Sequence, residues 1–163
     1  VKNSGVQYVI LRCGYRGSAS GVLVEDQKFK RNIQGATAAG LKVGIYFFSQ
    51  PVNEVEAVEE ASMTLSLIKN YRITYPVYID VESANGRADG ISKAARTSVI
   101  NAFCQTIRNS GYTPGLYANK NWLTQYVAAP TYGGRYEMWQ YSSRGSIAGI
   151  KGNVDLNVSY MGY

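Results

Sequence analysis

The chain has 163 residues, of which 45% are hydrophobic, and 17 basic against 11 acidic side chains give it a formal net charge of +6. It contains no histidine, which excludes Ser-His-Asp and Cys-His mechanisms and metal sites built on imidazole. No stretch approaches the ~20 apolar residues of a membrane helix, and neither a metal nor a cofactor is expected.

The size and the charge of the chain also limit the expected number of domains and the expected class of binding partner. A chain of this length and hydrophobic content is expected to fold as one domain, over residues 1–163, around a single core. The positive charge suits an anionic partner such as a bacterial wall or a nucleic acid. The basic residues are scattered, however, and no DNA- or RNA-binding motif is present, so we expect no nucleic-acid partner.

The first part of the chain alternates strand and helix patterns. Residues 8–15 (YVILRCGY) have the β-branched and apolar composition of a strand. A helix capped by Asp26 follows and ends near Gly40, and residues 42–49 (KVGIYFFS) form the next predicted strand. The buried face of this first helix is predicted to consist of Phe29, Ile33 and Ala36.

A second helix is predicted to begin at Asn53, where Glu56 stands at the spacing of a capping box. Apolar residues recur along this helix at helical spacing. Its predicted buried stripe consists of Val55, Val58, Ala61, Leu65 and Ile68. Its acidic residues are expected on the solvated face, without a chemical role: Glu54, Glu56, Glu59 and Glu60.

The strand Tyr75–Glu82 (YPVYIDVE) comes next, and a third helix is predicted from about Ser92. The inward face of that helix is predicted to consist of Ala95, Val99, Ala102, Phe103 and Ile107. The last predicted strands lie near residues 115–119, 137–142 and 154–158, with a short segment to Tyr126 after the first of them. Cys13 and Cys104 fall in a strand and a helix far apart, and are expected to be buried free thiols.

Three successive strand-then-helix units imply parallel strands joined by right-handed crossovers. The last third of the chain is poorer in helix. The sequence therefore predicts an α/β fold, a barrel that begins with β/α units and ends with plain strands. In barrels of this kind the catalytic groups lie at the carboxyl ends of the strands.

Two carboxylates close the strand Tyr75–Glu82. Alternation along a strand places Tyr78, Asp80 and Glu82 on one face and the aliphatic residues on the other. Paired acids are what glycosidic bond hydrolysis needs, because one donates a proton while another stays ionised. The alternative is an Asp-x-Glu pair that is merely solvated at a strand terminus. The position at the carboxyl end of the strand favours catalysis.

Other strand ends supply aromatic and polar side chains. The chain holds 14 tyrosines and two tryptophans, and flat rings suit sugar surfaces. A single aromatic residue is nevertheless more often part of a core than of a binding surface. Asp155 points with Asn157 away from the aliphatic side of its strand. The candidates for lining a substrate cleft are Tyr46, Tyr78, Tyr117, Asn119, Trp139 and Tyr141.

Five sequence blocks follow one another between Gly5 and Asn157: GVQYVILRCGYRG, the segment from Phe29 that ends in VGIYFFS, PVYIDVE, GYTPGLYANKNWL and MWQYSSRGSIAGIKGNVDLN. In this order they resemble the landmarks of glycoside hydrolase family 25, the muramidases often called Chalaropsis-type lysozymes. The resemblance implies an irregular (β/α)5(β)3 TIM-like barrel. It also implies that Glu82 is the general acid and that Asp80 and Asp155 are two further acids of the catalytic site.

The sequence departs from the family pattern in two places. Members typically begin with a strand of the form G-I-D-V-S, whose aspartate completes the acidic cluster, and this strand is absent here. We therefore expect either an N-terminally incomplete domain or a variant that closes differently, with an open edge along residues 8–12. Members also carry a W-x-A-x-Y strand before the W-Q-Y strand, for which residues 121–141 leave little space.

The resemblance implies hydrolysis of the β-1,4 bond between N-acetylmuramic acid and N-acetylglucosamine in peptidoglycan. The glycosyl intermediate would form on a carboxylate, Asp80 or Asp155, or on the substrate's own 2-acetamido group. The alternative function is a catalytically impaired domain that binds wall glycan. The expected partner is the peptidoglycan glycan strand, with an additional wall-binding module outside this chain. The expected location is the bacterial cell wall, as for a secreted autolysin or a phage endolysin, although no signal peptide is visible.

Overall fold

The computed structural model describes residues 1–118 and 138–160. These residues belong to two compact units. The larger unit contains residues 8–118, and the smaller one contains residues 1–7 together with residues 138–160. The larger unit carries Asp80 and Glu82, the first two acids that the sequence predicts.

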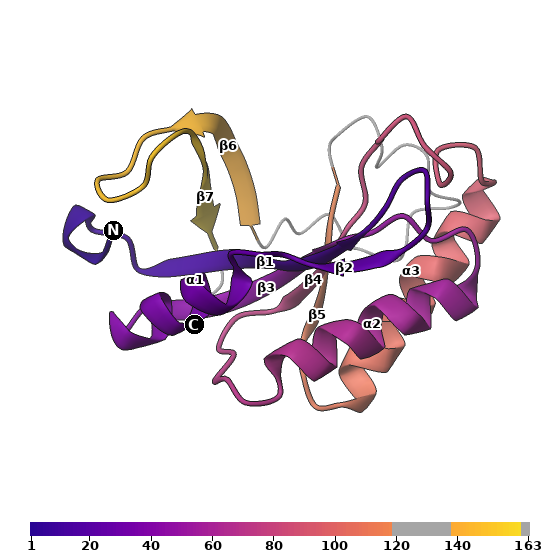
Figure 1. The fold of residues 1–163 in the computed structure, drawn as a ribbon, viewed down its shortest axis with the longest axis horizontal. Helices are drawn as coiled ribbons and strands as arrows, with labels where there is room; N and C mark the ends of the chain where they lie inside the picture. Colours follow the sequence, from indigo (N-terminus) through magenta and orange to yellow (C-terminus); the bar gives the residue numbers. More distant parts are fainter. Residues whose placement is uncertain (119–137, 161–163) are drawn as a thin grey trace. The chain divides into compact units, whose positions relative to one another are not determined.

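A five-stranded sheet forms the centre of the larger unit (Figure 1). Its strands are β1 (Tyr8–Arg16), β2 (Leu23–Glu25), β3 (Lys42–Phe48), β4 (Val77–Asp80) and β5 (Pro114–Tyr117). The spatial order is β2-β1-β3-β4-β5. Four strands, β1, β3, β4 and β5, run parallel, which confirms the prediction from the alternating pattern. The short β2, which the sequence pattern did not predict, pairs antiparallel with Gly14–Arg16 on the edge of β1 opposite β3.

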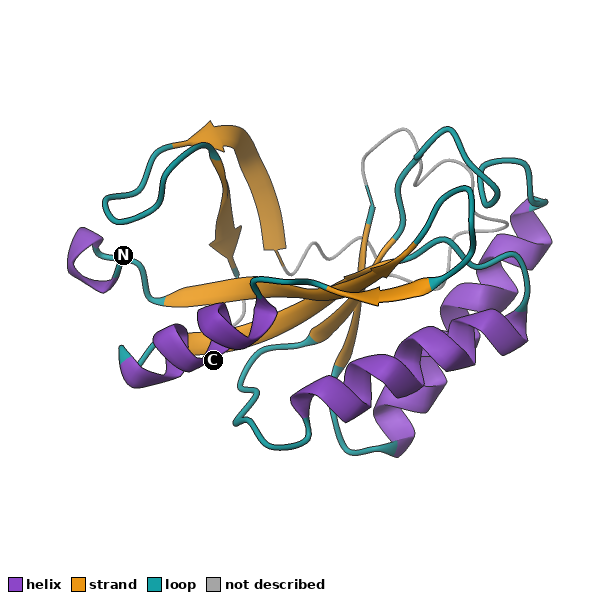
Figure 2. Cartoon of the chain, viewed as in Figure 1, coloured by secondary structure: helices purple, strands orange, loops and turns teal. Residues whose placement is uncertain are grey.

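Three helices connect the parallel strands: α1 (Phe29–Ala38), α2 (Glu54–Ile68) and α3 (Lys93–Asn109). Because the parallel strands are added in one direction, right-handed crossovers bring every helix to the same face of the sheet. Figure 2 shows the three helices on that one side. The core lies between the two layers, where Ile45, Phe47 and Ile79 of the sheet are fully buried together with helical residues such as Phe103.

Helix α1 buries the three residues that the sequence predicts, Phe29, Ile33 and Ala36. Its start differs slightly from the prediction. Asp26 is not the cap but stands in the preceding turn, where its side chain accepts a hydrogen bond from the main-chain N–H of Lys28 at 2.8 Å. The helix begins at Phe29 because this turn, rather than a side-chain cap, aligns its first residues.

The predicted start of α2 is confirmed, but its predicted buried stripe is only partly right, because Ala61 and Ile68 are buried while Leu65 is partly buried. The Asn53 side chain accepts a hydrogen bond from the N–H of Glu56 at 3.0 Å, as a helix cap does. Val55 and Val58 are 69% and 41% exposed, however. The face turned to the sheet consists of Ala57, Glu60, Ala61, Thr64 and Ile68. The helix is rotated in this way because Glu60 reaches into an ion pair beneath the sheet, described below.

Helix α3 begins after Ser92, whose hydroxyl accepts a hydrogen bond from the N–H of Ala95 at 3.1 Å. Val99, Phe103 and Ile107 are buried as predicted, while Ala95 and Ala102 are only partly buried. Both cysteines are free thiols, as expected, although Cys104 is only partly buried.

The smaller unit contains a short 3-10 helix (Lys2–Ser4) and an antiparallel pair, β6 (Met138–Gly145) and β7 (Val154–Ser159). Both strands were predicted, with slightly shorter bounds. Within the described parts of the chain, no helix has the length and the apolar character that a membrane crossing requires.

Candidate active site

Four of the predicted site residues lie on one face of the sheet. Register pairing sets Tyr78 of β4 beside Tyr46 of β3, and it sets Asp80 between Phe48 of β3 and Tyr117 of β5. Side chains of paired residues in parallel strands share a face. This is the face away from the helices, because the alternate residues, such as Phe47 and Ile79, are buried in the core.

A glycine makes room for one of these rings. A Cβ atom added to Gly115 would stand 2.5 Å from two ring carbons of Tyr78. The Tyr78 ring therefore lies directly over Gly115, its register partner on β5. A side chain at this position would displace the ring, so the glycine fixes the place of Tyr78 on the sheet.

Asp80 and Glu82 stand in different environments at the end of β4. Asp80 is the last residue of the strand and is 6% exposed. Its main-chain oxygen accepts a hydrogen bond from the N–H of Ser49 at 2.9 Å. Glu82 lies two residues beyond the strand and is partly exposed. At the end of β4 one carboxyl group is thus buried and the other is accessible.

The loop after Glu82 is fixed by a local hydrogen-bond cluster. The Asp89 carboxylate accepts hydrogen bonds from the Ser83 hydroxyl at 2.6 Å and from the N–H groups of Ala84 and Asn85 at 3.2 and 3.1 Å. Burial alone would raise the pKa of Asp89, but these hydrogen bonds outweigh it and hold the pKa below its ordinary value. The chain that leaves Glu82 is thereby held in one conformation.

A buried ion pair lies under the neighbouring strand ends, on the helix side of the sheet. The guanidinium Nε of Arg16 donates to Glu60 Oε1 at 2.9 Å, and the two side chains are 4% and 0% exposed. The Ser49 hydroxyl donates to the other oxygen of Glu60 at 2.5 Å. The expectation that Glu60 lies on a solvated helix face is therefore wrong. The expectation failed because the carboxylate is buried together with its partner Arg16, which comes from strand β1.

Further charged contacts continue this cluster. A second nitrogen of Arg16 donates to Glu59 Oε2 at 2.9 Å. Arg87 donates to both oxygens of Glu56, at 2.7 and 2.8 Å, and these hydrogen bonds lower the pKa of Glu56. Glu56 is thus a second acid that the sequence placed wrongly on a solvated face.

Burial raises the pKa of Glu60 to about 7, against the opposing effect of hydrogen bonds from Ser49, Arg16 and the N–H of Gln50. A carboxyl group whose pKa is higher in the folded than in the unfolded chain stabilises the fold below its unfolded pKa. That contribution is lost as the pH rises through the folded pKa. Glu60 should therefore lose its contribution between about pH 4.5 and about pH 7.

We expect Glu60→Gln to remove this pH dependence. The free energy of unfolding of the wild type, minus that of the variant, should fall as the pH rises through this window. The slope should not exceed about 1.4 kcal/mol per pH unit, the limit for one proton. Denaturant unfolding of both proteins at pH 4 to 8 measures it. A difference that stays constant or rises with pH would contradict the buried, protonatable state of Glu60.

The other predicted site residues lie in the smaller unit or outside the described residues. Trp139 pairs with Val158 in the β6–β7 hairpin. Tyr141 is 51% exposed, and Asp155 on β7 is exposed. Asn119 and the short segment to Tyr126 lie outside the described residues, as does most of the stretch 121–141, which leaves little space for the family strand W-x-A-x-Y.

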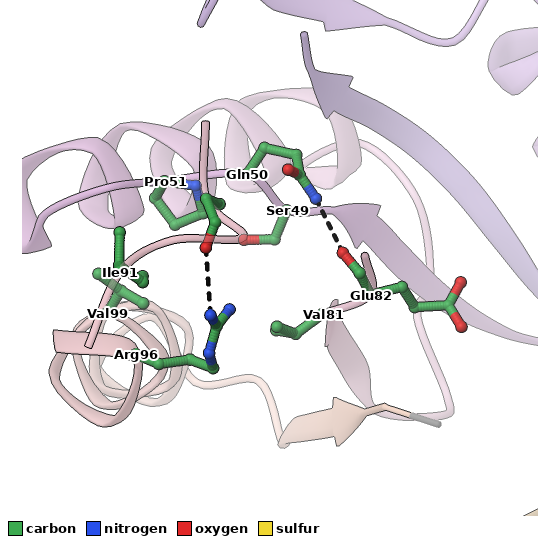
Figure 3. A pocket seen from close by; sticks show the side chains of 9 residues that line it. Ser49, Gln50, Pro51, Val81, Glu82, Ile91, Arg96 and Val99 are labelled. Carbon is green, nitrogen blue, oxygen red and sulfur yellow. Dashed lines mark hydrogen bonds between the residues drawn. The ribbon is translucent and has the colours of Figure 1, made fainter. Parts of the chain in front are cut away.

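A small cavity lies beside the main chain of Glu82 (Figure 3). Its volume of about 10 Å³ suits one water molecule rather than a sugar ring. Its lining is mostly apolar and consists of Ser49, Gln50, Pro51, Val81, Glu82, Ala88, Ile91, Arg96 and Val99. In Figure 3 the carboxylate of Glu82 extends away from Gln50. The carboxylate therefore does not point toward Gln50 in this cavity. In residues 1–118 and 138–160, no cluster of three or more acidic or thiol side chains could hold a metal ion.

Sequence reasoning missed Arg16, Gln50 and Glu60. Gln50 is fully buried, and its side-chain Nε2 donates to the main-chain oxygen of Glu82 at 3.1 Å. The available signal was positional, because Arg16 and Gln50 are polar residues at or just beyond the carboxyl ends of β1 and β3. That is the edge at which the carboxylates of β4 lie.

The profile of the family described as Glycosyl hydrolases family 25 matches residues 1–150 of this chain. The chain is 28% identical, over 174 aligned residues, to an autolytic lysozyme of Clostridium acetobutylicum, covering 96% of this chain and 50% of that protein. Its structure is similar to that of the modular autolysin LytC of Streptococcus pneumoniae, with a TM-score of 0.83 and 27% identity over 98% of this chain and 42% of LytC.

A bacterial lysozyme from Streptomyces coelicolor shares the fold, with a TM-score of 0.78 at 23% identity over 99% of this chain and 84% of that chain. The protein has the mixed α/β architecture with a parallel-strand sheet that these structures share. The chain spans half the length of the Clostridium protein and less than half of LytC.

Proposed function

The chain belongs to glycosyl hydrolases family 25, and from this premise we propose that it is a lysozyme of the N-acetylmuramidase type. Its proposed reaction is hydrolysis of the β-1,4 bond between N-acetylmuramic acid and N-acetylglucosamine in peptidoglycan. The structure of LytC, which is similar to this chain over 98% of the present chain, has been solved with a synthetic peptidoglycan ligand. The observation that carries the proposal is the pair Asp80 and Glu82 at the carboxyl end of β4.

Aromatic rings beside the two acids support a sugar substrate. Tyr46 and Tyr78 are register partners on adjacent strands, and Tyr117 is the partner of Asp80. All three tyrosines are partly exposed. Sugars present apolar C–H faces that pack against such rings, while their hydroxyl groups bond to polar neighbours.

In the proposed mechanism Glu82 gives its proton to the glycosidic oxygen as the bond from that oxygen to the sugar C1 breaks. Glu82 suits this task because it is partly exposed beyond the strand end. An ionised Asp80 would stabilise the positive charge that develops on the sugar ring. The group that bonds to C1 is Asp80, Asp155 or the 2-acetamido group of the substrate. Water then releases the sugar and returns a proton to Glu82.

The family resemblance extends the proposal to the rest of the chain. It assigns Asp155 to the acids of the site and Trp139 to the aromatic residues of the groove. Strand alternation adds Asn119 and Tyr141 as proposed substrate-binding groups. We further propose that the whole chain is one catalytic domain of the irregular (β/α)5(β)3 barrel type. The similarity to LytC over nearly the full chain supports this proposal.

The names of the similar proteins support a place of action. They include an autolytic lysozyme, the autolysin LytC and the endolysin CTP1L. We propose that this chain likewise acts on the bacterial cell wall, as part of an autolysin or an endolysin. An additional wall-binding module outside this segment would fit the greater length of the Clostridium protein and of LytC.

Asp80→Asn tests the enzymatic proposal on purified bacterial walls. We expect the wild-type chain to clear a wall suspension and the variant to do so roughly 10²-fold more slowly, because a neutral amide cannot offset the charge of the transition state. Turbidity gives the rate, and sedimentation with intact walls measures binding in parallel.

Both proteins should bind walls equally well in the sedimentation assay. Wild-type protein that binds walls without clearing them would support the alternative, a glycan-binding domain without catalysis. Equal clearing by both proteins would remove Asp80 from the mechanism.

A further inference from the structure

Gln50 connects the ends of two neighbouring strands where their register pairing has finished. The last pair between β3 and β4 is Phe48 with Asp80. Two residues beyond each of them stand Gln50 and Glu82. The side-chain Nε2 of Gln50 donates to the main-chain oxygen of Glu82 at 3.1 Å (Figure 3). A side-chain bond thus continues the connection between the strands past the end of the sheet.

The orientation of this amide follows from chemistry. A main-chain oxygen only accepts hydrogen bonds, so the nitrogen end of the carboxamide must face Glu82. The other end, Gln50 Oε1, is buried and has no hydrogen-bond partner among the residues that the structure describes. A buried amide that is only half satisfied costs stability. The hydrogen bond that Nε2 gives to the main-chain oxygen of Glu82 offsets part of this cost.

Gln50 is itself held by the charged cluster beneath the strand ends. Its main-chain N–H donates to Glu60 Oε1 at 3.2 Å. Its main-chain oxygen accepts a hydrogen bond from Arg87 at 3.4 Å. Arg87 also donates hydrogen bonds to both carboxylate oxygens of Glu56. Gln50 cannot move without disturbing its contacts to the buried Glu60 and to the partly buried Arg87. A group held in this way can impose its own position on the residue that it binds.

We propose that Gln50 is a positioning residue for the general acid: its amide fixes the main chain of Glu82, so that the carboxylate leaves the end of β4 in one direction. The proposal rests on the proposed function, in which Glu82 protonates the leaving oxygen. Catalytic groups need their geometry to within about 0.5 Å, and a misplacement of about 1 Å costs on the order of 10²-fold in rate. Gln50 supplies this precision at Glu82, which lies beyond the last register pair between β3 and β4.

Gln50→Met removes the donor and keeps nearly the same volume. On purified walls we expect kcat to fall roughly 10- to 100-fold with KM unchanged, since the substrate-binding rings stay in place. An aryl glycoside of a peptidoglycan disaccharide provides the decisive comparison. The phenolate of an activated aryl group such as 2,4-dinitrophenyl leaves without being protonated. The variant should therefore release it in the first turnover, before water returns a proton to Glu82, at the wild-type rate. Gln34→Met, on the exposed face of α1, is the matched control and should behave as wild type on both substrates.

The same measurements on Glu82→Gln separate the two proposals. Wall lysis by this variant would remove Glu82 from the role of general acid, and the positioning role of Gln50 with it. Failure of the wild-type chain to lyse walls would instead overturn the proposed function itself. If Glu82→Gln fails on walls while Gln50→Met keeps the wild-type kcat, only the positioning role is overturned.

Equal losses by Gln50→Met on both substrates would show a structural role and also overturn it. Gln50→Asn, which keeps an amide one methylene too short to reach, gives the same test should the methionine variant not fold. It should show the same selective loss on walls.

Discussion

Glu82→Gln should abolish the lysis of bacterial walls and leave the fold unchanged. The amide is nearly isosteric with the carboxyl group but has no proton to give to the leaving oxygen. Because Glu82 is partly exposed beyond the end of β4, the substitution leaves no buried charge unpaired. General acid catalysis contributes about 10²–10⁴-fold to such reactions, so the rate should fall by at least that range. Turbidity of a wall suspension measures it, with circular dichroism to verify the fold.

Glu54→Gln is the matched control for this experiment. Glu54 is exposed in the first turn of α2, far along the chain from the proposed acid. Its neutralisation should leave the rate of lysis unchanged. A correctly folded Glu82→Gln variant that still lyses walls at a substantial rate would remove Glu82 from the role of general acid.

The second large effect concerns stability. At pH 8, above the pKa of about 7 of Glu60, Arg16→Met should lower the free energy of unfolding by about 3–5 kcal/mol, the usual cost of removing one partner of a buried ion pair. The variant leaves Glu60, which is 0% exposed, without the guanidinium that it faces at 2.9 Å. Since small domains are stable by only about 5–15 kcal/mol, much of this protein's stability would be lost. Chemical denaturation of both proteins measures the difference.

Two further variants show whether the loss comes from the unpaired charge. Lys30→Met disturbs an exposed pair, in which Lys30 stands 3.9 Å from Glu25, and should cost less than about 1 kcal/mol. The double variant Arg16→Met with Glu60→Met removes both charges and should recover most of the lost stability. A double variant as unstable as Arg16→Met alone would show that the charges are not the cause.

Strand alternation predicted the arrangement of the sheet well. The segment Tyr75–Glu82 shows why, because its aliphatic residues alternate with Tyr78 and Asp80, and such a pattern turns all its aliphatic side chains to one face of the sheet. The parallel direction followed from the helices between the strands. The short β2 escaped prediction because three residues are too few to show any period.

Helix α2 shows where periodicity fails. Its valines and alanines offer two apolar stripes, and the pattern was interpreted with Glu60 on the solvated side. That interpretation assumes that a carboxylate avoids burial. The assumption fails here because Arg16, 44 positions earlier in the chain, supplies the partner. No local pattern contains that information, so Val55 and Val58 were assigned to the wrong side.

The same limit applies to the candidate site. Alternation along the strands identified Tyr46, Tyr78, Asp80 and Tyr117 as residues of one face, because sheet geometry alone brings them together. Gln50 was missed because its role depends on a contact with Glu82, 32 positions away. A glutamine beyond a strand end is typical of a solvated loop, and only the tertiary structure shows that it is buried.

The identity of the new reducing ends tests the central claim most directly. Purified walls are digested with the wild-type chain, the products are reduced with borohydride and hydrolysed, and the reduced amino sugar is identified by mass spectrometry. A muramidase cuts on the reducing side of N-acetylmuramic acid, so the account predicts that reduced muramic acid accumulates with time. Accumulation of reduced glucosamine instead, or of no reduced amino sugar at all, would contradict it.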